Sequence, residues 1–290
     1  LYPQPPHYLG GCARHAAGDR AIWEARDHCL RLAQLRPSVV RGFAFAGLAL
    51  FSVVQLSLLT IVGMPLIDTV LLAVLLVGLP ALAIAQAQLV SESEIERVKA
   101  YWMSIVFLSI LGLACWLIGT RDGGATEIGL VPRPLSSIAT WSFSLAAGCL
   151  SIALLSRPVA MWTGVTESAT VRQLFPRTRE EKGLFALLSV AAGFGEELAY
   201  RGYAIGMLVP LVGLVSAVVL TSVAFGVSHV YQGLLGMVRA GLVGVLLAWG
   251  VIASGSVWPA IVGHALVDVV LGLILAEKFL PPENSPGVRE

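Results

Sequence analysis

Six ionisable residues lie within otherwise apolar segments between residues 190 and 270: Glu196, Glu197, Arg201, His229, His264 and Asp268. An ionisable side chain inside membrane hydrocarbon costs roughly 2.5 kcal/mol or more, so such residues are functional candidates by default. A free carboxylate, two imidazoles and a supporting ion pair are groups that can activate water against an amide bond. The joint occurrence of all six on nearby segments favours chemistry over separate structural roles.

The spacing of these residues predicts which of them pair. Residues four apart lie on one face of a helix, so Glu197 and Arg201 are predicted to form an ion pair. Glu196 lies about 100° round the same helix and is not neutralised by that pair, which suits a general base or acid. His264 and Asp268 also share a face, so Asp268 is expected either to orient His264 or to bind the reacting group.

The composition indicates that membrane helices position these side chains. The chain has 290 residues, of which 57% are hydrophobic and 13% charged, and its mean hydropathy is +0.82. Soluble domains carry about 25% charged residues. The net charge of +1 and the lack of a Lys/Arg-rich block exclude a nucleic-acid partner. Because the four cysteines are scattered, neither a disulfide framework nor a thiolate metal site is indicated: Cys12, Cys29, Cys115 and Cys149.

The fold class predicted is all-α, a polytopic membrane bundle of about eight transmembrane helices. Each such helix needs roughly 20 mostly apolar residues. The stretches that qualify are 42–63, 66–90, 101–119, 137–156, 184–206, 210–229, 233–253 and 258–276. The chain then divides into a polar N-terminal cytoplasmic tail (1–41), four helices (42–156), a cytoplasmic linker (157–183), a four-helix catalytic core (184–276) and a C-terminal tail (277–290).

The distribution of basic residues predicts the orientation. If the N-terminus is inside, the inner segments hold the six arginines that precede residue 42, whereas the outer connections hold only Arg121 and Arg133. Positive side chains are retained on the cytoplasmic side. We therefore expect a multi-pass integral protein of a bacterial inner membrane, with both termini cytoplasmic. Asp68, the ionisable residue in the first four spans, is expected to reach water near a helix end.

Three short motifs resemble those of the CPBP family of intramembrane endopeptidases, which comprises CAAX proteases and bacteriocin-processing enzymes and is also called the ABI family. That family is marked by EExxxR, then FxxxH, then HxxxN or HxxxD. The corresponding segments here are EELAYR at 196–201, FGVSH at 225–229 and HALVD at 264–268, and the resemblance covers roughly residues 184–276.

The resemblance implies an eight-helix membrane fold and hydrolysis of a peptide bond in a protein or peptide substrate. That substrate would have a membrane-associated C-terminus, with or without a prenyl group, and the lipid bilayer would be the other partner. Glu196 would activate the water, and Glu197 and Arg201 would support it.

The resemblance also implies roles for the remaining residues. His229 and His264 would bind the water or a metal and stabilise the oxyanion, and Asp268 would complete the site. The prenyl-protein branch usually carries Asn at the position of Asp268, which weakens a specific CAAX assignment more than it weakens proteolysis.

Metal use stays open at this point. Glu196, His229, His264 and Asp268 form a donor set that suits Zn²⁺. No HExxH motif is present, and no other cofactor is indicated. We favour a glutamate-driven mechanism over a metal-dependent one.

Three other functions compete with proteolysis. A catalytically silent member of the same fold would act as an immunity or scaffold protein. A proton- or cation-coupled transporter would use Glu196, His229 and Asp268 as an ion relay. Ser228 beside His229 suggests a serine–histidine enzyme only weakly, because a nucleophile and its base should lie on facing elements.

Linear threading of the predicted spans separates the two histidines. His229 falls near the cytoplasmic end of its helix and His264 near the opposite end of its own. A joint site therefore requires a short, tilted or broken helix, which a membrane tolerates only where backbone is packed in protein or lines a cavity. The expected breaking points are glycines: Gly226, Gly233, Gly236 and Gly255.

Overall fold

The computed structural model of the chain describes residues 53, 57, 63–90, 95–163, 165 and 168–276, all within one compact unit, Ala44–Glu290. The regular elements in this part of the chain are helical, as the composition predicts. They are α3 (Leu66–Ala73), η1 (Val74–Gly78), α4 (Leu79–Val90), α5 (Arg97–Gly119), α6 (Leu135–Thr163), α7 (Ala169–Gln173), α8 (Arg179–Glu196), η2 (Glu197–Ala204), α9 (Ile205–Val212), α10 (Leu214–Ser228), η3 (Val230–Gln232), α11 (Gly233–Ser254), α12 (Trp258–Val269) and η4 (Val270–Ile274). Three of them, η1, η2 and η4, are π-helical.

Five helical stretches are long and apolar enough to cross a membrane: Leu66–Ala87, Arg97–Gly119, Leu135–Trp162, Arg179–Val212 and Val230–Ser254. Two shorter apolar helices complete the set, Leu214–Ser228 and Trp258–Ile274. Each predicted span after residue 63 corresponds to one of these stretches. The predicted span 42–63 and both tails lie largely or wholly outside the described residues.

The boundary predicted between residues 206 and 210 is wrong. One helical run continues from α8 through η2 and α9 to Val212, with Pro210 inside it, and the chain turns at Gly213, whose φ is +79°. A proline lacks only its own N–H, whereas a turn of this kind needs a positive φ that glycine adopts without strain. The chain therefore turns at Gly213 and not at Pro210.

The segment predicted as a polar linker, 157–183, is partly helical. α6 extends past Pro158 to Thr163, and the short helix α7 follows. α8 then begins with a capping box: the Glu181 N–H donates to the Thr178 hydroxyl, and the Thr178 N–H donates to the Glu181 carboxylate. This box satisfies two N–H groups at the start of the helix that leads to Glu196.

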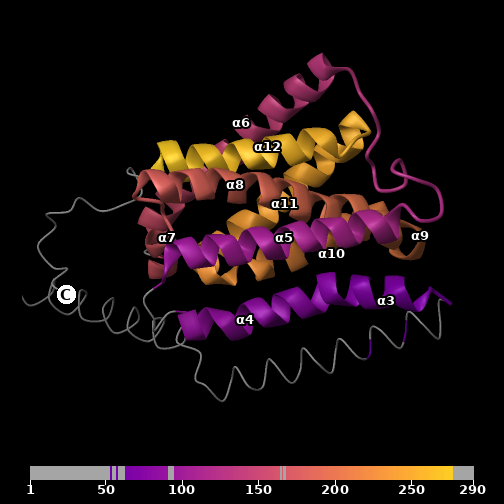
Figure 1. The fold of residues 1–290 in the computed structure, drawn as a ribbon, viewed down its shortest axis with the longest axis horizontal. Helices are drawn as coiled ribbons and strands as arrows, with labels where there is room; N and C mark the ends of the chain where they lie inside the picture. The colour runs from indigo at the N-terminus through magenta and orange to yellow at the C-terminus, as the bar shows by residue number, and fades with distance from the viewer. Residues whose placement is uncertain are drawn as a thin grey trace, which may run out of the picture. The chain divides into compact units, whose positions relative to one another are not determined.

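α8 lies between α5 and α12, and glycines allow it to approach both (Figure 1). A Cβ at Gly195 would lie 2.3 Å from the Leu108 carbonyl oxygen of α5. A Cβ at Gly193 would lie 2.5 Å from the Ile261 carbonyl oxygen of α12. Backbone contact on both sides fixes the end of α8, where Glu196 lies.

GxxxG spacing is typical of close packing between two helices, but Gly202 and Gly206 approach a connecting segment instead. Their open sides face the connection between α5 and α6: a Cβ at Gly202 would lie 2.8 Å from the Ile128 carbonyl oxygen, and one at Gly206 would lie 3.7 Å from the Glu127 carbonyl oxygen. These glycines let a connecting segment cover the helix that carries the first motif.

Candidate active site

Three separate segments bring the six predicted residues into one region. Glu196 ends α8, and Glu197 and Arg201 belong to η2, which continues the same helical run. His229 caps the C-terminus of α10. His264 and Asp268 lie on α12, which packs against α8.

Glu197 is the fully buried centre of this region. Its Oε1 atom accepts a hydrogen bond from Arg201 Nη1 at 2.7 Å, which is the pair that the i, i+4 spacing predicts. The same oxygen lies 2.7 Å from His264 Nδ1. Arg201 and His264 are also buried, with 4% and 7% exposure. Because this carboxylate already accepts from Arg201, His264 Nδ1 is the donor and carries a proton.

The orientation of His264 therefore comes from Glu197 and not from Asp268, the residue expected to provide it. His264 Nε2 lies 3.7 Å from Glu196 Oε2 and 3.7 Å from Asp268 Oδ2. Both distances exceed a direct hydrogen bond, and at such a separation a water molecule can bridge the groups. Nε2 is thus the ring atom that faces two carboxylates with room for a reactant.

His229 is held in a fixed tautomer by the main chain. Its Nδ1 lies 2.8 Å from the Phe225 carbonyl oxygen. A carbonyl oxygen only accepts, so Nδ1 carries the proton, and in the neutral ring Nε2 has a lone pair.

The Phe225 ring is the spacer between the two histidines. Its centroid lies 4.5 Å from that of His229 and 6.2 Å from that of His264. The Arg201 guanidinium carbon lies 4.3 Å from the same centroid, a cation–π contact. FxxxH spacing shows that Phe225 lies near His229, but its contacts with α12 and η2 are long-range and the sequence does not reveal them.

The two histidines line the same cavity, and the short length of α10 allows this. Its 15 residues span about 22 Å at 1.5 Å per residue, less than the roughly 30 Å of hydrocarbon. The chain then turns back at Gly233 (φ +84°), and after α11 it turns again at Gly255 (φ +66°). Two of the four expected glycine breaks are therefore confirmed; Gly226 and Gly236 lie inside α10 and α11.

Two tyrosines that sequence reasoning missed anchor η2 to the first described helices. The Tyr200 hydroxyl donates to the Leu75 carbonyl oxygen at 3.3 Å, and the Tyr203 hydroxyl donates to Asp68 Oδ1 at 2.7 Å. A π-helical turn is rare and occurs often at functional sites. Here it carries Glu197 together with the two tyrosines, whose hydroxyls contact α3 and η1.

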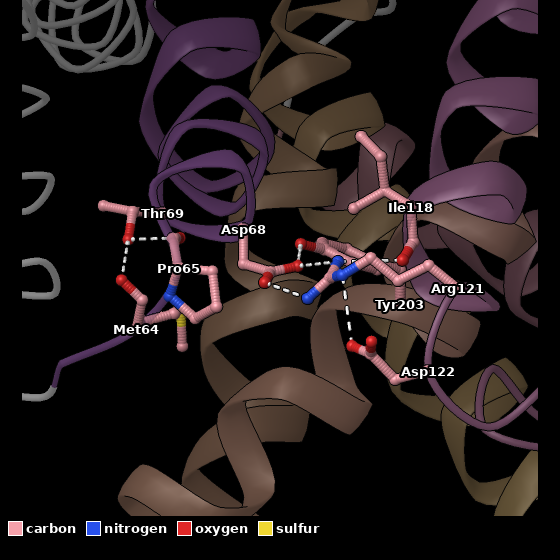
Figure 2. Close-up of polar contacts among 8 residues, drawn as sticks. All are labelled: Met64, Pro65, Asp68, Thr69, Ile118, Arg121, Asp122 and Tyr203. Atoms are coloured by element: carbon pink, nitrogen blue, oxygen red, sulfur yellow. Dashed lines mark hydrogen bonds and ion pairs between the residues drawn. The ribbon is translucent and has the colours of Figure 1, made fainter.

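Asp68 does not reach water as expected. It is fully buried and forms a two-pronged ion pair with Arg121, at 2.8 Å (Nη1–Oδ1) and 2.5 Å (Nη2–Oδ2), in addition to the Tyr203 bond (Figure 2). The hydrogen bond and charge of Asp68 raise the pKa of Arg121, which follows α5. The partner of Asp68 lies 53 positions away and could not be identified from helix spacing.

A cavity of about 910 Å³ contains the reactive side chains. Glu196, His229, His264 and Asp268 line it, and its walls come from helices α4 to α8 and α10 to α12. Much of the remaining wall is apolar, including Leu82, Phe107 and others of α4, α5 and α8. The arrangement can hold a water molecule and a peptide in one partly shielded space.

The four predicted metal donors line one cavity. In the described part of the chain, no three His, Cys, Asp or Glu side chains lie close enough together to hold a metal ion. His264 Nδ1 is bonded to Glu197 and His229 Nδ1 to a carbonyl, which leaves two Nε2 atoms and two carboxylates around open space.

The comparisons with known proteins locate a family domain on these residues. No curated protein and no solved structure has a significant match to the chain. Residues 179–270 match the family described as type II CAAX prenyl endopeptidase, Rce1-like. This stretch begins with α8 and contains all six residues of the site. Residues 179–270 are therefore an Rce1-like domain, which is consistent with an intramembrane protease of the CPBP family.

Proposed function

We propose that this protein is an intramembrane endopeptidase that hydrolyses a peptide bond of a membrane-associated substrate. Glu196 activates the water, and the other residues of the site are Glu197, Arg201, His229, His264 and Asp268. The Rce1-like domain supports a protease of the CAAX endopeptidase type. The observation that carries the residue assignment is the position of His264 Nε2, at 3.7 Å from both Glu196 and Asp268 and at the wall of the cavity.

In the proposed reaction, a water molecule near Glu196 attacks the carbonyl carbon of the scissile bond and gives its proton to the Glu196 carboxylate. His229 Nε2 accepts a hydrogen bond from that water and orients it. The C–N bond then breaks, and Glu196 returns the proton to the leaving nitrogen, so that a carboxylic acid and an amine result.

His264 is the group that stabilises the developing oxyanion. As an imidazolium, the ring keeps its Nδ1 proton on Glu197 and carries a second proton on Nε2, the atom that faces Glu196 and Asp268. In that form Nε2–H donates to the oxyanion, and a donor placed in advance in a shielded site contributes strongly to the rate. Asp268 supports the same proton without bonding directly to it.

The proposed substrate is a protein or peptide whose C-terminal region lies in the membrane, with or without a prenyl group. The apolar cavity walls support a lipid-bound or hydrophobic substrate. Arg97 at the start of α5 bonds to Glu181 at the start of α8 and to the Gln173 carbonyl of α7. α5 and α8 therefore begin at the same end of the bundle, where their first turns also carry Lys99, Arg179 and Lys182, and this basic end supports a cytoplasmic position for it.

The deciding experiment compares membranes that lack the protein with membranes that carry the wild type, Glu196→Gln or Glu180→Gln. Glu180 is an exposed carboxylate on the same helix and serves as the matched control. We expect a C-terminally trimmed product, detected by mass spectrometry, with the wild type and Glu180→Gln but not with Glu196→Gln. A cellular phenotype that Glu196→Gln restores fully, with no trimmed product in any sample, would instead support the silent scaffold.

A further inference from the structure

A tyrosine hydroxyl in the cavity wall has no role in the proposed mechanism. Tyr231 lies in η3, the single turn that follows His229, and it lines the cavity that contains Glu196 and His229. The Tyr231 ring lies 5.9 Å from the His229 ring, centroid to centroid, with 31° between the two planes. One or two residues of extended peptide span roughly 3.5–7 Å. A substrate with its scissile bond beside His229 therefore places its next one or two residues beside Tyr231.

The neighbours of this hydroxyl fix the direction of its hydrogen bond. Arg239 Nη2 lies 3.1 Å from one end of the Gln232 carboxamide, and because a guanidinium only donates, this end is the carbonyl oxygen Oε1. The other end is therefore the NH₂ group, which donates to the Tyr231 hydroxyl at 3.2 Å. The hydroxyl oxygen is the acceptor in that bond, so its own proton is left for another group.

The main chain of η3 holds Tyr231 in place from two sides. The Ser168 hydroxyl donates to the Tyr231 carbonyl oxygen at 2.6 Å, and the Ser168 N–H donates to the Gln232 carbonyl oxygen at 3.2 Å. The Gln232 N–H donates to the His229 carbonyl oxygen at 2.9 Å. These bonds join η3 to the segment before α7 and to the end of α10. A donor that is ordered before the substrate arrives costs little further entropy when it binds.

A peptide carbonyl is the acceptor that suits this hydroxyl. Within the described part of the chain, the Tyr231 hydroxyl has one hydrogen bond, which it accepts from Gln232. Much of the surrounding wall is apolar, so a peptide bound there loses water from its backbone carbonyls. Each such C=O then needs a donor, and the Tyr231 O–H is a neutral donor fixed at the wall.

We propose that the Tyr231 hydroxyl donates a hydrogen bond to a backbone carbonyl of the bound substrate, one or two residues from the scissile bond, and so fixes the peptide against His229. This inference rests on the proposed function and adds a substrate-binding residue to it. The scissile carbonyl itself is left to His264.

The first test compares the wild type with Tyr231→Phe, which removes one oxygen atom. Both full-length proteins are assayed in detergent with a peptide that ends in S-farnesyl-Cys-Val-Ile-Ser. Loss of a neutral hydrogen bond should lower kcat/KM by roughly 3- to 15-fold. Tyr101→Phe is the matched control, because Tyr101 also lines the cavity but its hydroxyl donates to the Leu174 carbonyl oxygen, and it should keep the wild-type kcat/KM. Equal kcat/KM values for Tyr231→Phe and the wild type would overturn the inference.

The second test locates the carbonyl that accepts the bond. In a set of probe peptides, one carbonyl at a time is replaced by a thioamide, whose sulfur is a weak acceptor. Mass spectrometry of the products identifies the cleaved bond. One thioamide, one or two residues from that bond, should slow the wild type but not Tyr231→Phe. The same slowing in both proteins at every position, or a difference confined to the scissile carbonyl, would overturn the assignment.

The third test changes the direction of the hydrogen bond. In Gln232→Glu the side chain only accepts, so the Tyr231 hydroxyl would donate to the carboxylate and no longer to the substrate. In that background Tyr231→Phe should change kcat/KM by less than about twofold, because the two changes remove the same interaction. A full 3- to 15-fold effect in both backgrounds would refute the role of the Tyr231 proton. Cleavage of no peptide by the wild type, together with no trimmed product in membranes, would instead overturn the proposed function itself.

Discussion

The contact between α8 and α5 at Gly195 can be tested by one methyl group. In Gly195→Ala the added Cβ would lie 2.3 Å from the Leu108 carbonyl oxygen and 3.0 Å from its carbonyl carbon. Ordinary C···O contacts are about 3.3–3.6 Å, so the two helices must separate by roughly 1 Å. Backbone atoms cannot rotate away as a side chain can, so the helix is displaced at residue 195, next to Glu196.

The expected cost follows from two opposing terms. Overpacking a close contact costs about 1–3 kcal/mol, and replacing glycine by alanine in a helix recovers up to about 1 kcal/mol. Because the clash is with a backbone atom, the overpacking cost lies near the top of its range, and the net effect of Gly195→Ala is a destabilisation of about 2 kcal/mol. A displacement of about 1 Å at a catalytic group can lower the rate by ~100-fold, so we expect activity to fall more than stability.

Gly183 provides the matched control on the same helix, because a Cβ there meets nothing within 4 Å. Gly183→Ala should keep the wild-type cleavage rate and unfold at an equal or higher temperature. The assay measures the thermal unfolding midpoint and the rate of peptide cleavage for both variants in one detergent. If Gly195→Ala matches Gly183→Ala in both, the backbone contact does not set the position of Glu196.

Substitutions centred on three further residues, Glu197, Asp268 and Asp68, test other contacts in the site and near it. Glu197→Gln leaves the buried Arg201 charge without its partner, so the free energy of unfolding by denaturant should fall by about 3–5 kcal/mol. The double variant Glu197→Gln/Arg201→Met should recover part of this loss. No recovery would mean that the pair is not isolated from water. Asp268→Asn keeps an oxygen near His264, so its cleavage rate should stay within about tenfold of the wild type, whereas Asp268→Leu should lose cleavage. An equal loss of rate in both variants would show that the charge itself is required. Asp68→Asn should lower the free energy of unfolding by about 1–3 kcal/mol. Asp122→Asn is the control, because the Asp122 side chain is exposed, and it should change that free energy by less than about 0.5 kcal/mol. Similar effects at both positions would contradict the burial of Asp68.

The features that the sequence predicts correctly depend on local spacing and on hydrophobic runs. Apolar stretches of about 20 residues indicate α5, α6 and α11, and a separation of four identifies the Glu197–Arg201 pair. A helix face is fixed by the chain itself, so no knowledge of tertiary contacts is needed. The Rce1-like domain is likewise recognisable, because its motifs are short and occur in order.

The contacts that the sequence did not reveal join residues far apart in the chain. Glu197 and His264 are 67 positions apart, and Tyr203 and Asp68 are 135 apart. Helical periodicity gives no information about which faces meet across a bundle. The π-helical turn η2 adds a further difficulty, because it rotates Tyr200 and Tyr203 away from where a regular 3.6-residue period would put them.

The buried Glu197–Arg201 pair has a consequence that stability alone does not explain. An ion pair in a dry interior often contributes no more stability than well-packed apolar residues of the same volume. Here Glu197 Oε1 accepts from Arg201 Nη1, and the same oxygen lies 2.7 Å from His264 Nδ1, so that nitrogen is the donor and carries a proton. The second nitrogen, Nε2, is then the one that faces Glu196 and Asp268, whether the ring is neutral or charged. A pair of apolar residues would fill the same space but would leave the imidazole free to take either tautomer. The Glu197–Arg201 pair requires the burial of two charges, and its effect is to fix the position of a single proton on His264.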